Sequence, residues 1–307
     1  MNSAVNTLLK EQCVEWQQCG DNYAALETVE VRETAIGGYN FKVQFNPKRI
    51  QSSAAKVDPK SIQERKCFLC EANRPSVQRG ISFTSSLGND YVILVNPFPI
   101  FKKHLTIPSI QHQDQLIEGK IEDMLELADK LEDYLIFYNG PKCGASAPDH
   151  FHFQAGNKGF LPIEMEIEQI LSTSTQIGET TYTLNNAAAY TIVCKSETPN
   201  TIASWFNAFY KNFSKLTSSS EEPMMNLLAW KAGATYYLVV YPRKAHRPSQ
   251  FFAEGEENIL ISPASIDLGG IFITPLEKDY NKITSADIKD ILQQITVTEE
   301  TFNELIK

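Results

Sequence analysis

Two of the five histidines of this chain lie one residue apart, in the segment His150-Phe151-His152-Phe153-Gln154. Side chains of a β-strand alternate between its faces, so this spacing would place both histidines and the glutamine on one exposed face. A neutral imidazole whose N–H is held by an acceptor can attack phosphorus with its free nitrogen. Gln154 could donate an N–H to a phosphoryl oxygen. The alternative is a strand with a merely polar face, because so short a motif often occurs by chance.

The loop before this segment could contribute to the same chemistry. Residues 144–148 read G-A-S-A-P, a turn whose backbone N–H groups could face an anion together with the Ser146 hydroxyl.

Cys67 and Cys70 have the C-x-x-C spacing of a zinc site, but no second C-x-x-C follows. Other residues would have to complete the ligand set, and His104 and His150 are candidates because both lie at strand ends. If His150 bound a metal, it would help to fix the strand that carries His152. Two reduced, unligated thiols are equally compatible with the spacing, and a redox pair is the least favoured interpretation.

The hydrophobic pattern predicts the elements that would position these residues. Strands are expected at residues 25–32, 39–45, 91–95, 104–108, 182–184, 190–194, 236–241 and 271–274. Helices are expected at residues 4–18, 114–135 and 201–213, and after Thr284, where T-S-A-D resembles a capping box. In the second of these helices, apolar residues spaced alternately by four and three would form one buried stripe.

The length of 307 residues is sufficient for two domains, and a second half begins near residue 160. No low-complexity linker divides the halves, so we expect them to pack closely. Residues 91–97 and 236–242 are both apolar strands closed by proline, an internal echo that reflects either duplication or chance. Arg243, Lys244, His246 and Arg247 follow the second of them. These residues could reach substrate phosphates, but a solvated loop is favoured.

The composition excludes several classes of protein. A net charge of −9 argues against a binder of long nucleic acid, while it is compatible with a small phosphorylated ligand. No apolar run approaches the roughly 18 residues of a membrane span, and the first residues do not resemble a signal peptide. We therefore expect a cytoplasmic location, no membrane partner and cysteines that form no disulfide framework.

Taken together and in order, these segments resemble the histidine-triad (HIT) superfamily. The similarity is strongest to its transferase branch: galactose-1-phosphate uridylyltransferases, diadenosine tetraphosphate phosphorylases and GDP-hexose phosphorylases. The segments that carry it are C-F-L-C-E-A-N-R, N-P-F-P-I-F-K-K-H-L-T-I-P and N-G-P-K-C-G-A-S-A-P-D-H-F-H-F-Q, within roughly residues 40–160. The resemblance implies an α+β fold with an antiparallel sheet, packed helices and two HIT-like halves. Residues 1–160 would form the catalytic domain and residues 161–307 a degenerate second one.

The resemblance also implies roles for individual residues. His152 would be the nucleophile, while Gln154 and Ser146 hold phosphate oxygens. Four further residues would contact the substrate: Asn139, Asn96, Gly144 and Lys142.

The resemblance assigns a structural zinc ion to Cys67, Cys70, His104 and His150. Asp149 is an extra residue before the first histidine, which alters the expected geometry of the serine loop. It could also place an acid beside His150.

The glutamine at the third position of H-x-H-x-Q resembles the transferases, since the hydrolase branch has histidine there. We therefore expect a nucleotidyltransferase or phosphorylase acting on a nucleoside diphosphate sugar or a dinucleoside polyphosphate. The nucleotidyl group on His152 would pass to phosphate or a sugar phosphate, and a homodimer is compatible with this function. The alternatives are a nucleotide-binding or regulatory protein without turnover and a HIT-type nucleotide hydrolase.

Overall fold

The computed structural model describes residues 1–50, 58–185, 189–218 and 221–307. Within them, an antiparallel ten-stranded sheet forms the centre, in the order β3-β4-β5-β7-β6-β11-β12-β10-β9-β8. Its strands are β3 (Gly80–Thr84), β4 (Asp90–Val95), β5 (His104–Pro108), β6 (Tyr134–Asn139), β7 (His152–Asn157), β8 (Thr175–Gln176), β9 (Thr181–Asn185), β10 (Tyr190–Ser196), β11 (Met225–Ala232) and β12 (Thr235–Pro242). A smaller sheet contains β1 (Glu30–Ile36), β2 (Tyr39–Phe45) and β13 (Ile271–Thr274). The expected α+β class is confirmed.

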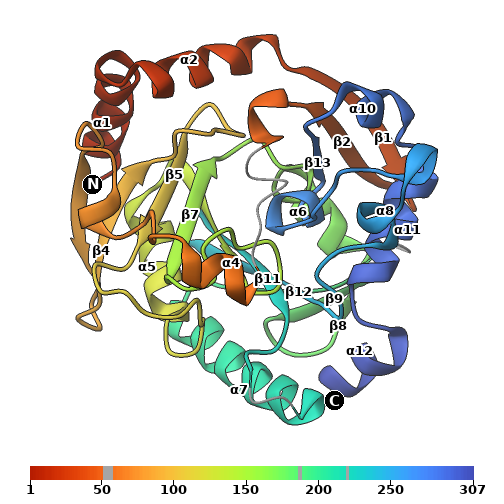
Figure 1. Ribbon diagram of the computed structural model, residues 1–307. Helices are drawn as coiled ribbons and strands as arrows, with labels where there is room; N and C mark the ends of the chain where they lie inside the picture. The colour runs from red at the N-terminus through yellow and green to blue at the C-terminus, as the bar shows by residue number, and fades with distance from the viewer. Residues whose placement is uncertain (51–57, 186–188, 219–220) are drawn as a thin grey trace.

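Helices surround the sheets (Figure 1). They are α1 (Asn2–Glu15), α2 (Gln17–Ala25), α4 (Pro59–Glu64), α5 (Ile121–Lys130), α6 (Pro162–Ser172), α7 (Pro199–Thr217), α8 (Ser249–Phe252), α9 (Ser265–Leu268), α10 (Glu277–Lys282), α11 (Ser285–Ile295) and α12 (Glu299–Leu305). Among the described residues, none of these helices is both long enough and apolar enough to cross a lipid bilayer.

The large sheet consists of two halves with the same connectivity. Counted from the two outer edges, the strand orders are 3-4-5-7-6 and 8-9-10-12-11. Each half has its long helix between its third and fourth strands, α5 in the first and α7 in the second. The two HIT-like halves are therefore confirmed. The sequence echo does not follow this repeated connectivity, because its segments form β4 and β12, the second strand of one half and the fifth of the other.

The halves join through their fourth strands, because β6 pairs with β11 and makes the sheet continuous. The division into domains at residue 160 remains a prediction.

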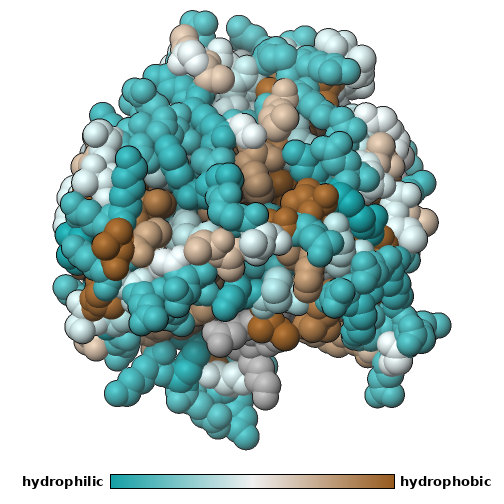
Figure 2. Space-filling model, turned by 90° about the horizontal axis from the view of Figure 1, so that it is seen from above, coloured by the Kyte–Doolittle hydropathy of each residue, from teal (hydrophilic) through white to brown (hydrophobic). Residues whose placement is uncertain are grey.

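The two faces of the large sheet are covered differently. On one face, α5, α7 and α12 pack on a core that includes Phe151 and Phe153, as the alternation of the histidine segment predicts. On the other face, the second half is covered by α6, α11 and the small sheet. The surface in Figure 2 is mostly hydrophilic, and its hydrophobic residues form separate patches, the largest of them near the centre.

Several elements differ from the expected ones. The helix expected at 114–135 is present only as α5, and Tyr134–Asn139 forms strand β6 instead. β6 is buried on both faces, so its sequence lacks the alternation that identifies a half-exposed strand. Trp16 adopts an extended conformation and divides the expected first helix into α1 and α2. The capping box at Thr284 is confirmed, since Asp287 N donates to Thr284 Oγ1 and Thr284 N donates to Asp287 Oδ2.

A buried carboxyl group, that of Glu222, connects the two halves beside β6. Its carboxylate accepts hydrogen bonds from Ile117 N and, at 2.6 Å, from the Tyr138 hydroxyl. The same hydroxyl lies 3.0 Å from the carbonyl oxygen of Gln115. A protonated Glu222 could donate to the Tyr138 oxygen and leave the hydroxyl proton for Gln115. Burial raises the pKa of Glu222 to about 7, although the hydrogen bonds from Tyr138 and Ile117 act to lower it.

We predict that Glu222 makes the folded state less stable as the pH rises. Its folded pKa exceeds the value of about 4.3 typical of an unfolded chain, so the folded state binds more protons between these values. Raising the pH through this window should lower the free energy of unfolding by roughly 1–3 kcal/mol. In Glu222→Gln this contribution should be absent. Urea unfolding of both proteins at pH 5 and pH 8 measures the difference, and parallel pH dependences would contradict the prediction.

Candidate active site

A cavity of about 540 Å³ lies on the open face of the first half. Thr106, Gln154 and Phe137 form a row across β5, β7 and β6 that lines it. The cavity brings together most of the residues that the sequence predicted to act on substrate: His152, Gln154, Ser146, Asn139, Asn96 and Gly144. The second half closes one side with residues that the sequence did not suggest: Ser262, Ala264, Ile266, Asp267 and Ile273.

His152 is the first residue of β7 and is only 3% exposed, so it is more enclosed than expected. Its Nδ1 lies 2.9 Å from the carbonyl oxygen of His150. A carbonyl can only accept, so Nδ1 carries the proton and Nε2 keeps its lone pair. Burial lowers the pKa of His152 to about 4, which keeps the ring neutral. This is the state that a nucleophilic imidazole requires.

Gln154 is oriented by His104. His104 Nδ1 accepts a hydrogen bond from Ile100 N at 3.2 Å, so its Nε2 carries the proton. That nitrogen lies 3.1 Å from Gln154 Oε1 and donates to it. The amide nitrogen of Gln154 is thereby left to donate elsewhere. Burial is the main reason that the pKa of His104 falls to about 3, so the ring is neutral.

Asn139 is held from the second half of the chain. Its Oδ1 accepts from Ser265 N at 2.9 Å, from Ser265 Oγ at 2.5 Å and from Asn226 Nδ2 at 2.8 Å. Arg243 Nη1 donates to Asn226 Oδ1 at 2.7 Å. Arg243 is therefore a buried structural residue, 2% exposed, and the interpretation of its segment as a solvated loop is wrong for this residue.

Two further cavity residues show local constraints. Gly144 has a φ of +95°, and a Cβ atom there would lie 2.6 Å from Ala264 Cβ, so the loop requires glycine. Asn96 already uses both ends of its amide, with Nδ2 donating to Thr106 Oγ1 and Oδ1 accepting from Phe98 N.

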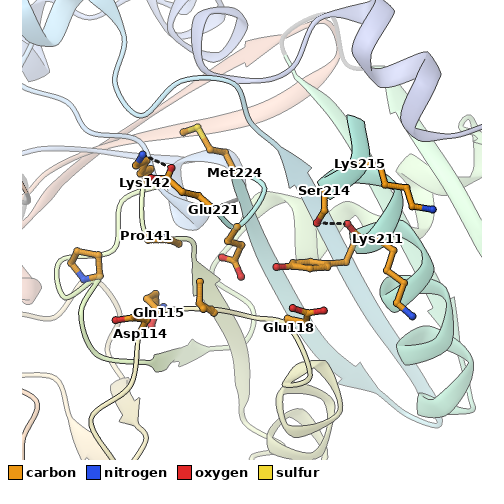
Figure 3. Close-up of a pocket in the computed structure, with 14 residues that line it drawn as sticks. Asp114, Gln115, Glu118, Pro141, Lys142, Lys211, Ser214, Lys215, Glu221 and Met224 are labelled. Atoms are coloured by element: carbon orange, nitrogen blue, oxygen red, sulfur yellow. Dashed lines mark hydrogen bonds and ion pairs between the residues drawn. The ribbon is translucent and has the colours of Figure 1, made fainter. Parts of the chain in front are cut away.

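Lys142, in contrast, lies away from His152. It lines a different cavity, of about 670 Å³, where its ammonium group pairs with Glu221 (Figure 3). The structure therefore does not bring Lys142 together with the other predicted substrate residues.

A second group of side chains could hold a metal ion. One ligand atom from each of Cys67, Cys70, His112 and His150 lies within 4.8 Å of the others. His150 Nδ1 is 3.2 Å from Cys67 Sγ, and His112 Nδ1 is 3.3 Å from Cys70 Sγ. Zinc bonds of about 2.0–2.3 Å in a tetrahedron separate ligand atoms by roughly 3.3–3.8 Å. The donor set and these distances fit zinc.

The expectation that His104 completes this group is wrong, because both its ring nitrogens are used at Gln154 and Ile100. His112 takes its place, from the segment that follows β5. His112 is the one histidine of the five for which the sequence suggested no role. That gap was the signal that could have identified it as a ligand.

His150 precedes β7, so it does not share a strand face with His152 as the alternation predicted. Its ring faces the cysteines, and its Nε2 lies 2.8 Å from the carbonyl oxygen of Ser109. Asp149, which was expected beside His150, forms an ion pair with Arg65.

The half-buried side chain of Arg49 also faces the cavity. Arg49 Nη1 donates to the carbonyl oxygen of Phe98 at 2.6 Å, while its buried Nε has no hydrogen-bond partner in the described part of the chain. Burial lowers the pKa of Arg49 to about 10, so it remains a cation. A half-buried cation with an unused donor is suited to an anionic ligand.

Two family models match the chain: a domain of unknown function (DUF4922) at residues 8–157, and a GDPGP1-like C-terminal domain at residues 165–307. No curated protein shows significant similarity to it.

Among solved structures, yeast Ap4A phosphorylase Apa2 is 16% identical with a TM-score of 0.62, over 91% of this chain and 96% of its own. Its complex with Ap4A has the same identity and coverage and a TM-score of 0.61. A uridylyltransferase structure is 14% identical with a TM-score of 0.38, over 86% of this chain and 99% of its own. The two family models together span most of the chain, and the fold is that of the yeast phosphorylase.

Proposed function

We propose that this protein is a nucleotidyltransferase or phosphorylase that forms a nucleotidyl intermediate on His152. Its substrate would be a nucleoside diphosphate sugar or a dinucleoside polyphosphate. The observation that carries the proposal is the state of His152: a neutral, buried imidazole with Nδ1–H held by the His150 carbonyl, beside a cavity of about 540 Å³. This state prepares Nε2 for attack on phosphorus.

The reaction consists of two displacements. In the first, His152 Nε2 attacks the phosphorus next to the nucleoside. A P–N bond forms, and the bond to the bridging oxygen breaks with its electron pair leaving on the departing phosphate. The proton stays on Nδ1, where the His150 carbonyl stabilises the positive ring. In the second, an oxygen of phosphate or a sugar phosphate attacks the same phosphorus, and the P–N electron pair returns to Nε2.

Donors around the cavity would stabilise the phosphoryl oxygens. The Gln154 amide nitrogen is available because His104 occupies Gln154 Oε1. The Ser146 hydroxyl lines the same cavity, and Asn139 can offer only its Nδ2, since its Oδ1 is saturated. Fixed donors of this kind stabilise charge as it develops in the transition state.

The yeast protein with the same fold supports the choice of ligand, because its crystal structures include complexes with AMP and with Ap4A. The aromatic and aliphatic side of the cavity provides a surface for a base or sugar. It includes Trp16, Phe68, Phe98, Phe137 and Ile266. A cytoplasmic location and a homodimer remain predictions from the sequence.

We predict that one of three substrates leaves an acid-labile label on the protein. UDP-glucose, GDP-glucose and diadenosine tetraphosphate, each labelled at the phosphate next to the nucleoside, serve as probes. His152→Gln should abolish the label while the melting temperature shows that the variant is folded. Label retained by this variant would contradict the assignment of the nucleophile.

The same probes separate the alternatives. Stabilisation by a nucleotide without label or turnover would identify a nucleotide-binding protein. Release of nucleoside monophosphate into water, without transfer to phosphate or a sugar phosphate, would identify a hydrolase.

We further propose that Cys67, Cys70, His112 and His150 hold a structural zinc ion. The bound ion would fix the ring of His150, while the Ser109 carbonyl fixes its other nitrogen.

We predict about one zinc per chain, with loss of the metal in Cys67→Ser and in His112→Asn. His104→Asn should retain zinc while lowering the rate of transfer, because it frees Gln154 to rotate. Elemental analysis of the purified proteins provides the measurement. A folded wild type without zinc, or loss of zinc in His104→Asn, would contradict this assignment.

We also propose that Arg49 binds a substrate phosphate. Arg49→Met should weaken binding of a nucleoside diphosphate about 10- to 100-fold, the loss of one charge-assisted contact worth about 1.5–3 kcal/mol. Binding of the corresponding nucleoside should be unchanged. Arg79→Met is the control, because Arg79 pairs with Glu11 and Glu15 and does not line the cavity. Equal losses for diphosphate and nucleoside in calorimetric titrations would rule out the phosphate contact.

A further inference from the structure

The pairing of β6 with β7 stops just before the candidate active site. The last pair is Phe137 with Gln154, and the register sets each residue opposite a partner. Continued by two residues, the same register would set Asn139 opposite His152. These residues do not pair, although both side chains line the cavity.

The side chain of Gln115 takes the place of the missing pair. Its Oε1 accepts from His152 N at 2.7 Å, and its Nε2 donates to the carbonyl oxygens of His152 and Asn139, each at 3.0 Å. One carboxamide therefore satisfies backbone groups of both strands. Paired strands lie about 4.8 Å apart, whereas an interposed carboxamide requires two hydrogen bonds in series. The strands must therefore separate at this point.

Gln115 is itself held firmly. It is completely buried, its N–H donates to the carbonyl oxygen of Pro148 at 3.1 Å, and its own carbonyl lies 3.0 Å from the Tyr138 hydroxyl. Figure 3 shows it from the side of the neighbouring cavity, next to Asp114. Its position is thus determined by its contacts with the loop before β7 and with β6, and not by the side chain of His152.

The segment that carries Gln115 also carries the candidate metal ligand His112. Along this segment, Ser109 N donates to the Phe151 carbonyl at 2.9 Å, and Phe151 N donates to the Gln113 carbonyl at 2.6 Å. Backbone hydrogen bonds therefore join this segment to both backbone groups of Phe151. Phe151 lies between the candidate metal ligand His150 and the proposed nucleophile His152.

We propose that Gln115 is a positioning residue, which keeps β6 and β7 apart so that His152 and Asn139 face the substrate across a fixed gap. The inference rests on the proposed function, because that function gives a reason for the gap: His152 and Asn139 must both face the substrate. Without the carboxamide, His152 N–H could pair directly with the Asn139 carbonyl, and the two side chains would move together. A misplacement of a reacting group by about 1 Å costs on the order of 100-fold in rate.

The test compares Gln115→Met, which keeps length and volume but removes the hydrogen bonds, with Gln12→Met. Gln12 is also completely buried and also bonds only backbone groups, those of Val77 and Arg79, outside the cavity. In single-turnover labelling with whichever of the three substrates is active, Gln115→Met should be about 100-fold slower, and the substrate Kd should change less than about 3-fold. Gln12→Met should label within about 3-fold of wild type, although it loses comparable stability.

A second readout needs no substrate. In protein labelled with ¹⁵N-histidine, the His152 ring, assigned by its absence in His152→Gln, should show the Nδ1–H tautomer. Its signals should shift in Gln115→Met and not in Gln12→Met. Gln115→Glu retains the acceptor for His152 N–H and serves if the methionine variant does not fold; it should give an intermediate rate and an altered ring signal.

The outcomes are distinct. An unchanged His152 ring in Gln115→Met, or equal rate losses in both glutamine-to-methionine variants, would overturn the role of Gln115. If the wild type takes no label from any substrate, the proposed function fails, and the ring spectra still decide whether Gln115 positions His152.

Discussion

The structure around the cavity depends on one hydrogen bond, from His152 Nδ1 to the carbonyl oxygen of His150. It selects the tautomer of His152, the proposed nucleophile, and fixes the plane of its ring. The same residue directs its own side chain to the cysteines, so its backbone serves one site and its ring the other. These separate roles of the His150 backbone and ring explain the one-residue spacing of the two histidines. A longer spacing would separate the candidate metal ligands from His152.

The repeated connectivity of the two halves did not produce two equivalent sites. In the second half, the corresponding face of the sheet carries Trp230 and Tyr237, which stack at 5.1 Å in a core covered by α6 and α11. That half instead supplies the far side of the first cavity, and Ser265 saturates the Asn139 oxygen. The repeated connectivity thus forms one site with walls from both halves.

Residues close together on one strand could be predicted from the sequence, because alternation is a local property. His152, Gln154 and the buried Phe153 are examples. The choice between His104 and His112 as the fourth candidate metal ligand could not be predicted, because it depends on how the segment after β5 folds back on residues 148–152. Strand β6 also escaped prediction, because a central strand that is buried on both faces shows no alternation. Gln115 carries no motif, and its importance appears only where two strands separate.

The seam between β6 and β11 has a consequence for synthesis of the chain. Asn226 bonds Asn139, which precedes it by 87 residues. At about 5–20 residues per second, a ribosome needs roughly 4–17 s to complete this interval. During that time β6 has an unpaired edge, of the kind that recruits foreign strands. The nascent first half therefore passes through a period in which a chaperone or rapid elongation would protect it from aggregation.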